Sequence, residues 1–120
     1  MTVASPTALY SPPTTRGGMN EEAFMVLVTD YASWHGWQWA HIRSGRTVHG
    51  WRTPISGPLG EGFPDLILVK GERLLLVELK GDGGRLAEPQ KRVIAVLERA
   101  VPVLVCWPYD WPRLKEILDE

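Results

Sequence analysis

Apolar residues along this chain follow two spacings, which predict helices and strands in turn. Helical spacing begins at Asn20, a residue type that favours the cap position of a helix, and ends at Gly36. We therefore expect a first helix over about 20–35. The segment 37–43 alternates apolar and polar residues and predicts a strand, whereas 44–62 is rich in Gly, Pro and Arg and predicts a long irregular loop.

Two apolar runs, 66–69 and 74–77, predict a β-hairpin. The four residues 70–73 between them fit a two-residue type II′ turn with glycine at its first central position. That turn sets the register of the two strands. Counting back along the hairpin in steps of two, Asp65 faces Glu78 on one side of the sheet.

The remaining chain completes an α/β pattern. A second helix is expected to begin near Glu88, a fourth strand to cover 101–107, and a short last helix to be capped by Asp110. The order αβββαβα predicts a mixed four-stranded sheet flanked by helices, with the third and fourth strands parallel and joined by a right-handed crossover. Residues 1–18 are rich in Ser, Thr, Pro and Gly and are expected to form a flexible arm, leaving 19–120 as one domain.

The predicted register brings two carboxylates together at the end of a sheet. Like charges opposite each other destabilise a strand pair, and a bound divalent cation would reverse that effect. Lys80 lies two residues beyond Glu78 and projects from the same face, where its ammonium can reach a water or a phosphate. The pattern favours a metal site that attacks phosphodiesters. The alternative is a solvated hairpin edge, which apolar residues on both faces of the hairpin disfavour.

Composition limits the remaining classes. The 120 residues are 44% hydrophobic, enough for one small domain, and the net charge of −1 neither supports nor excludes nucleic-acid binding. Cys106 is the single cysteine, which excludes an intramolecular disulfide. It lies in an apolar run, which indicates an inert core thiol. No apolar stretch approaches the roughly 18 residues that span a membrane, and a signal-peptide pattern is missing. We expect a soluble, cytoplasmic protein.

A basic stretch with an aromatic residue follows the first predicted strand. Its arginines suit phosphate contacts and its tryptophan suits stacking on bases, but a solvated loop with the tryptophan folded onto the core explains it equally well. Lys91 and Arg92 on the second helix could add phosphate contacts, although the polar face of a helix explains them equally well. The candidate DNA-binding residues are Arg43, Arg46, Trp51, Arg52, Arg85 and Lys91. Most of the other tryptophans are expected in the core, with Trp107 and Trp111 beneath the last helix.

With these residues placed, the chain resembles the VRR-NUC branch of the PD-(D/E)xK nuclease superfamily over about residues 20–107. The resemblance rests on a G-x-P-D motif, an E-x-K strand, a G-R-L triplet and a glutamine. The matching residues are Gly62, Pro64, Asp65, Glu78, Lys80, Gly84, Arg85, Leu86 and Gln90. It implies a restriction-endonuclease-like fold with an αβββαβ core.

The resemblance also implies roles for individual residues. Asp65, Glu78 and the main-chain carbonyl of Leu79 would bind Mg²⁺ or Mn²⁺, since such hard cations prefer oxygen ligands. Lys80 would orient or help deprotonate the attacking water. Gln90 would position water or Lys80.

Many members of this family add an acid from the first helix, and Glu21 and Glu22 are the two candidates. Helical spacing favours Glu21, because it shares a stripe with Phe24 and Val28. The alternative is that both glutamates simply favour the positive end of a helix.

These expectations together describe a metal-dependent DNA endonuclease. Stand-alone members of this size resemble phage-type junction resolvases, which implies structure-specific cutting of duplex, flap or branched DNA by a homodimer. The alternative is a nucleic-acid-binding module that keeps the nuclease fold without cutting. The sequence leaves open which DNA structure is cut, whether one strand or both are cut, and how many metal ions are bound.

Overall fold

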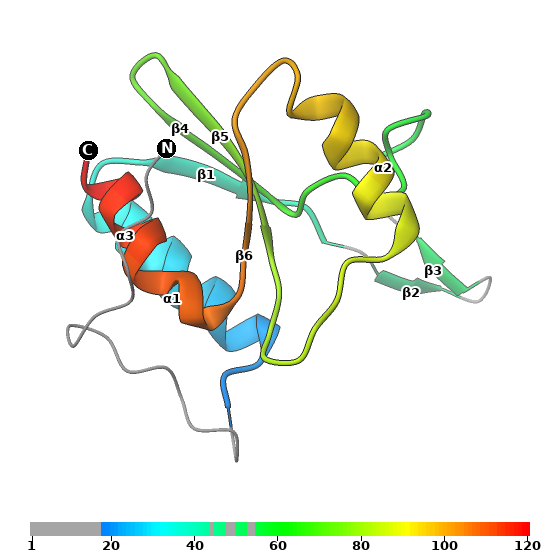
Figure 1. Cartoon of the computed structure of the whole chain (residues 1–120), viewed down its shortest axis with the longest axis horizontal. Coiled ribbons are helices and arrows are strands. Elements are labelled where there is room, and N and C mark those ends of the chain that lie inside the picture. Colours follow the sequence, from blue (N-terminus) through cyan, green and yellow to red (C-terminus); the bar gives the residue numbers. More distant parts are fainter. Residues whose placement is uncertain (1–17, 44, 48–49, 53–54) are drawn as a thin grey trace. The chain divides into compact units, whose positions relative to one another are not determined.

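The computed structural model describes residues 18–43, 45–47, 50–52 and 55–120 (Figure 1). The arm predicted for 1–18 therefore lies, apart from Gly18, outside the described residues. The elements, in chain order, are α1 (Glu21–Trp34), β1 (Gln38–His41), β2 (Gly45–Thr47), β3 (Gly50–Arg52), β4 (Leu66–Lys70), β5 (Arg73–Leu79), α2 (Glu88–Leu97), β6 (Val103–Cys106), the 3₁₀ turn η1 (Pro108–Asp110) and α3 (Trp111–Asp119). No helix among these residues is both long and apolar enough to cross a membrane.

Four strands form one mixed sheet in the order β1-β4-β5-β6. Strands β4 and β5 are antiparallel. Strand β6 runs parallel to β5, because the amides of Leu76 and Lys80 donate to the carbonyls of Pro102 and Cys106, four residues apart on both strands. The predicted α/β fold with a mixed four-stranded sheet is confirmed, including the parallel third and fourth strands.

The hairpin register is also confirmed. Lys70 pairs with Arg73, and the ladder runs from there to Leu66 opposite Val77. Gly71, the first central residue of the turn, has φ of 61°. Among the described residues only glycines have a positive φ, so φ of Glu72, the second central residue, is negative. A type I′ turn needs positive φ at both central residues, so the turn is the predicted type II′.

The irregular loop expected over 44–62 is partly wrong. Strands β2 and β3 form a small antiparallel sheet there, with Arg46 opposite Trp51 and Gly45 opposite Arg52. Strands of three residues are too short to display an alternating pattern, so composition alone suggested a loop.

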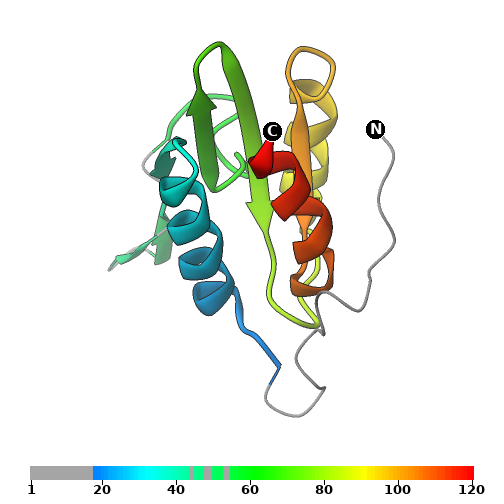
Figure 2. The same ribbon diagram turned by 90° about the vertical axis from the view of Figure 1, so that its left-hand side faces the viewer.

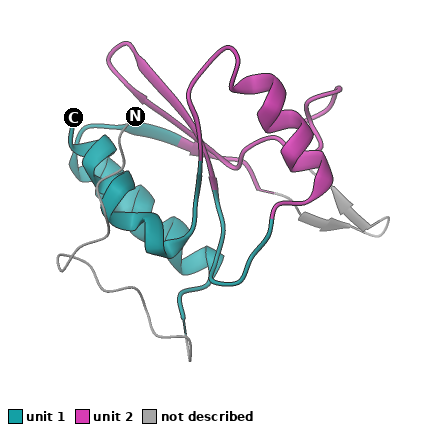
Figure 3. Cartoon of the chain, viewed as in Figure 1, with its two compact units in different colours: residues 1–39, 79–85, 105–120 teal, residues 40–78, 86–104 magenta. Residues whose placement is uncertain are grey.

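The chain divides into two compact units, shown in teal and magenta in Figure 3. Unit 1 comprises Met1–Trp39, Leu79–Arg85 and Val105–Glu120, and unit 2 comprises Ala40–Glu78 and Leu86–Leu104. Each unit buries apolar side chains of its own. In unit 1 these come mainly from α1 and α3, whereas in unit 2 they come from the β4–β5 hairpin and α2.

Helix α1 begins and ends as its sequence predicts. The side chain of Asn20 accepts a hydrogen bond from the amide of Ala23 at 2.8 Å, which caps the helix. Gly36 follows the helix with φ of 85°, a conformation that suits glycine. Asp110, in contrast, forms no side-chain cap on α3. Its carboxylate accepts from the amide of Trp107 at 3.0 Å and closes η1 instead.

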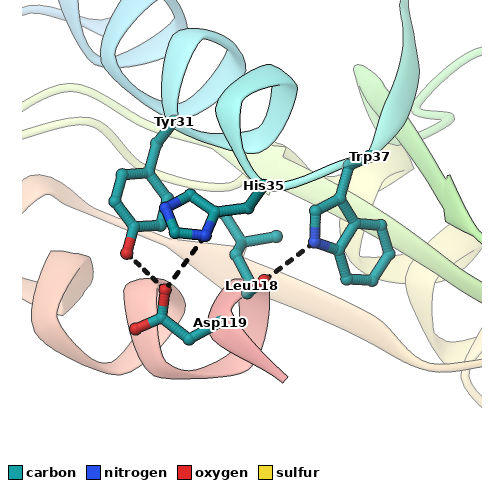
Figure 4. Close-up of polar contacts among 5 residues, drawn as sticks. All are labelled: Tyr31, His35, Trp37, Leu118 and Asp119. Carbon is teal, nitrogen blue, oxygen red and sulfur yellow. Dashed lines mark hydrogen bonds and ion pairs between the residues drawn. The ribbon is translucent and has the colours of Figure 1, made fainter.

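Within unit 1, α1 and α3 lie side by side and run in the same direction (Figure 2). The indole nitrogen of Trp37 donates to the carbonyl of Leu118 at 2.9 Å, in the interior. The hydroxyl of Tyr31 donates to the carboxylate of Asp119, and His35 lies 3.7 Å from the same carboxylate (Figure 4). These contacts tie the end of α3 to the end of α1.

Candidate active site

Glu78 lies near the end of β5 in unit 2, at the buried end of the hairpin. The face that it shares with Leu74 and Leu76 becomes progressively more buried along the strand, from a partly exposed Leu74 at the tip to Glu78, which is 2% exposed. A buried carboxylate is costly unless hydrogen bonds or opposite charges stabilise it. The Nε2 atom of Gln90 supplies one hydrogen bond, to Oε2 of Glu78 at 2.9 Å.

Asp65 directly precedes β4 and is half-buried. Its carbonyl accepts a hydrogen bond from the amide of Ile42 at 2.8 Å, so its backbone is held on the side of β1. The observed ladder ends at Leu66 opposite Val77. Continued by one residue, the same register sets Asp65 opposite Glu78, as the sequence predicts.

Both ends of the Gln90 amide are engaged. While Nε2 donates to Glu78, Oε1 accepts a hydrogen bond from the amide of Ala87 at 2.8 Å. Ala87 occupies the cap position of α2 and has no side-chain acceptor, so Gln90 reaches back to the first turn as a capping-box residue does. The start of α2 thereby orients the side chain that holds Glu78. Whether Gln90 also positions water or Lys80 stays a prediction.

Gly62 explains how the loop before Asp65 approaches α2. Its φ is 97°, and a Cβ atom added there would lie 2.5 Å from the carbonyl carbon and oxygen of Pro89. Only glycine fits so close a contact in that conformation. Gly62 of the G-x-P-D motif therefore lies against the backbone of Pro89, the residue before Gln90, within unit 2.

Lys80 follows β5 and belongs to unit 1, where it is 9% exposed. Its amide continues the ladder with Cys106, at 2.9 Å from the carbonyl. A Cβ added to Gly84 would lie 3.4 Å from Cβ of Lys80, so the G-R-L turn folds against this lysine. Gly84 thus lies against the Cβ end of the Lys80 side chain.

The start of α1 lies against the residue that follows Lys80. A Cβ added to Gly81 would lie 2.5 Å from the amide nitrogen of Glu21, and the amide of Asp82 donates to the carbonyl of Met19 at 3.0 Å. The side chains of Glu21 and Glu22 are both exposed. The contacts therefore bring the backbone of Glu21 next to the Lys80–Gly81 segment.

The buried face of α1 distinguishes the two glutamates. The residues three, four and seven positions after Glu21 are all buried, namely Phe24, Met25 and Val28. Of the residues three, four and seven positions after Glu22, Met25 and Thr29 are buried but Val26 is exposed, so Glu22 lies toward the edge of that face. Glu21 is thus in line with the buried face of the helix.

The candidate DNA-binding residues are distributed over both units. Arg43, Arg85 and Lys91 are exposed, and Lys91 pairs with Glu88 at 3.1 Å. Burial, and then the charge of Arg43, lower the pKa of His41. Arg46, Trp51 and Arg52 lie on β2 and β3, where the structure describes the backbone and not the side chains.

Sequence reasoning missed a pair of aromatic rings beside the G-R-L turn. Trp111 is buried, as expected, whereas Trp107 is half-buried and its indole nitrogen donates to the carbonyl of Gly84 at 2.8 Å. The ring of Trp107 also stacks on Tyr109. No local pattern marks this contact, because Gly84 and Trp107 are distant in sequence.

Cys106 is buried, which raises its pKa to about 12 and confirms the inert thiol.

The donor set suits a hard divalent cation. Asp65 and Glu78 offer carboxylate oxygens. Among the described residues no third His, Cys, Asp or Glu side chain joins a group that could hold a metal, so the protein side chains would supply two ligands. Mg²⁺ is commonly held by one or two carboxylates, with waters and substrate oxygens completing its shell. Two carboxylates fit that pattern.

A comparison with protein families agrees with this geometry. The model of the VRR-NUC domain matches residues 29–107, which contain the G-x-P-D, E-x-K and G-R-L motifs and Gln90. No curated protein matches the chain. The domain is of nuclease type, its substrates are nucleic acids, and nucleases of this kind typically use divalent metals. The chain belongs to the VRR-NUC domain family, within the restriction-endonuclease-like PD-(D/E)xK nuclease superfamily.

Proposed function

We propose that this chain is a metal-dependent DNA endonuclease that hydrolyses phosphodiester bonds at Asp65, Glu78 and Lys80. The observation that carries the proposal is the buried carboxylate of Glu78, which accepts a hydrogen bond from Gln90. The hairpin register, continued by one residue beyond Leu66 and Val77, would set Asp65 opposite this carboxylate. Burying an acid near a strand end, with a side-chain amide that orients it, favours a chemical role over a structural one.

Asp65, Glu78 and the main-chain carbonyl of Leu79 are the proposed ligands of Mg²⁺ or Mn²⁺. When bound, the cation would supply positive charge to the phosphate and lower the pKa of a water molecule. The role of Gln90 is to keep one oxygen of Glu78 in a constant orientation. An oriented ligand loses less entropy on binding than a mobile one.

Lys80 is proposed as the cation that faces the reacting phosphate. The backbone stays extended through this residue, since its amide continues the β5–β6 ladder. Side chains alternate along an extended chain, so Lys80 and Glu78 project to the same side. The Nζ atom of Lys80 would donate hydrogen bonds to the attacking water and to a phosphate oxygen that gains charge in the transition state. Glu21 is proposed to support Lys80 from the start of α1.

DNA that is duplex, flapped or branched is the proposed substrate, in the manner of junction resolvases. The exposed cations Arg43, Arg85 and Lys91 would contact phosphates, as would Arg46 and Arg52 of β2 and β3. Trp51 of β3 would stack on a base. Symmetric incision of a junction would need two sites related by a two-fold axis, and hence a homodimer.

Cleavage of supercoiled plasmid, a 5′ flap, a 3′ flap and a four-way junction tests the proposal, each with Mg²⁺, Mn²⁺ or EDTA. Asp65→Asn, Glu78→Gln and Lys80→Met should each lower the cleavage rate about 100- to 1,000-fold. Asp82→Asn, an exposed acid in the following turn, is the matched control and should cut like the wild type.

The alternative function, a binding module that does not cut, predicts a different result. The wild type would then bind DNA at the same affinity as Asp65→Asn and cut none of the four substrates with either metal. Titration calorimetry with Mn²⁺ gives an independent readout, because Asp65→Asn and Glu78→Gln should abolish its binding in the absence of DNA.

A further inference from the structure

The turn between β6 and α3 holds two aromatic rings in a parallel arrangement. The ring centroids of Trp107 and Tyr109 are 6.1 Å apart and their planes differ by 8°. The turn itself is rigid, because Asp110 bonds Trp107 twice: its amide donates to the Trp107 carbonyl at 2.8 Å and its carboxylate accepts from the Trp107 amide at 3.0 Å. Pro108 between them is fully buried. The backbone positions from which the two rings project are thus held by the turn.

The two rings differ in how they are held. Trp107 is half-buried and anchored by its indole N–H to the carbonyl of Gly84 at 2.8 Å. Tyr109 is 52% exposed. The exposed ring of Tyr109, parallel to the anchored ring of Trp107, leaves flat aromatic surface open to solvent. Because the Trp107 side chain is already held, a ligand that stacks on this surface costs little further side-chain entropy.

Trp107, the anchored ring, contacts the turn that follows Lys80. Gly84, which accepts the Trp107 hydrogen bond, is the residue whose added Cβ would lie 3.4 Å from Cβ of Lys80. All of these residues belong to unit 1. Figures 1 and 2 show the segment after β5 alongside the turn that leads into α3. Gly84 therefore contacts both the anchored ring, through its carbonyl, and the Cβ end of the Lys80 side chain.

We propose that Trp107 and Tyr109 form a stacking platform for an unpaired nucleobase next to the phosphate that is cut. This inference rests on the proposed nuclease function and names the substrate class within it. Bases of any identity stack on aromatic rings, whereas bases inside a duplex already stack on each other and present no free face. Arg85, the exposed cation directly after Gly84, supplies charge complementary to the adjoining phosphates. The platform therefore selects DNA with a single-stranded nucleotide at the cut, such as a flap or an open branch.

Fluorescence anisotropy of labelled DNA tests the platform without cleavage, in EDTA and in Ca²⁺. The two probes are a duplex with a single-stranded flap and a blunt duplex with the same number of nucleotides. Tyr109→Ala should weaken binding of the flap about 5- to 100-fold and change binding of the blunt duplex less than about twofold. Tyr109→Phe keeps the ring and should bind both probes like the wild type. Trp34→Ala, which removes a 78% exposed ring from α1, is the matched control and should alter neither.

Three outcomes would overturn the platform. In the first, Tyr109→Ala binds the flap as tightly as the wild type does. In the second, Tyr109→Ala loses the same affinity for the flap and for the blunt duplex. In the third, Tyr109→Phe loses as much affinity for the flap as Tyr109→Ala does. Thermal melting of each variant verifies that it is folded. Because the assay measures binding alone, a wild type that cuts nothing but binds the flap through Tyr109 would refute the nuclease function and support the platform.

Discussion

The side-chain amide of Gln90 donates a hydrogen bond to the buried Oε2 atom of Glu78 at 2.9 Å, while its oxygen accepts from the amide that begins α2. One side chain thus has two tasks, capping a helix and orienting an acid. Substitutions that separate these tasks show which one the site needs.

Gln90→Glu keeps the acceptor for the Ala87 amide but replaces the donor to Glu78 by a like charge. We expect a cleavage rate about 10- to 100-fold lower, with a higher Mg²⁺ requirement, because the orientation of Glu78 is lost. Gln90→Ala should show the same defect and also lose about 1 kcal/mol of unfolding free energy, since the helix start loses its cap. Rates across a Mg²⁺ series and urea unfolding measure both effects. Normal cleavage by Gln90→Glu would contradict the orienting role.

Gly62 and Gly57 form a matched pair, because both have φ of 97°. A Cβ added at Gly57 meets nothing within 4 Å, whereas one added at Gly62 meets the backbone of Pro89 at 2.5 Å. Gly57→Ala should therefore cost only the backbone strain, about 1 kcal/mol. Gly62→Ala should cost about 1–3 kcal/mol more, because the loop must move away from α2. Urea unfolding measures the difference, and equal losses would show that the close contact does not matter.

Glu21 and Glu22 can be distinguished by activity. Glu21→Gln should lower cleavage about tenfold if this acid supports Lys80, whereas Glu22→Gln should cleave like the wild type. Both changes remove a negative charge from the first turn of α1, so each should lower the unfolding free energy by up to about 0.5 kcal/mol. Equal stability losses with unequal activity would support the assignment. Equal activity of the two variants would remove Glu21 from the site.

Tyr31 should make the folded state sensitive to alkaline pH. Burial, and then its hydrogen bond and proximity to Asp119, raise its pKa from 10.0 to about 12. A raised pKa means that the folded state holds this proton more tightly than the unfolded chain. The resulting stability is complete below pH 10 and is lost as the pH rises through 12. The difference in unfolding free energy between wild type and Tyr31→Phe should therefore shrink over that window, as urea unfolding at fixed pH values can measure. A constant difference would contradict the raised pKa.

Local patterns determined much of what the structure contains. The register of the β4–β5 hairpin, from Lys70 opposite Arg73 to Leu66 opposite Val77, follows from a two-residue turn and a period of two, so it could be derived from the sequence. Helix α1 could be placed from Asn20 and Gly36 for the same reason, since caps and periodicity act within a few residues. The motif residues of the family are likewise contiguous or nearly so.

Tertiary structure alone decided which distant segments meet. The contact of Gly62 with Pro89, the bond from Gln90 to Glu78 and the anchoring of Trp107 on Gly84 each join residues on different elements. Such contacts depend on how loops and helix ends pack, which no local spacing encodes. Strands β2 and β3 escaped detection because their pairing stabilises segments too short to show a period. The sequence by itself therefore determined the hairpin register and the family, because both depend on local patterns. Packing decided which side chain bonds Glu78 and that the Trp107 ring is anchored on Gly84.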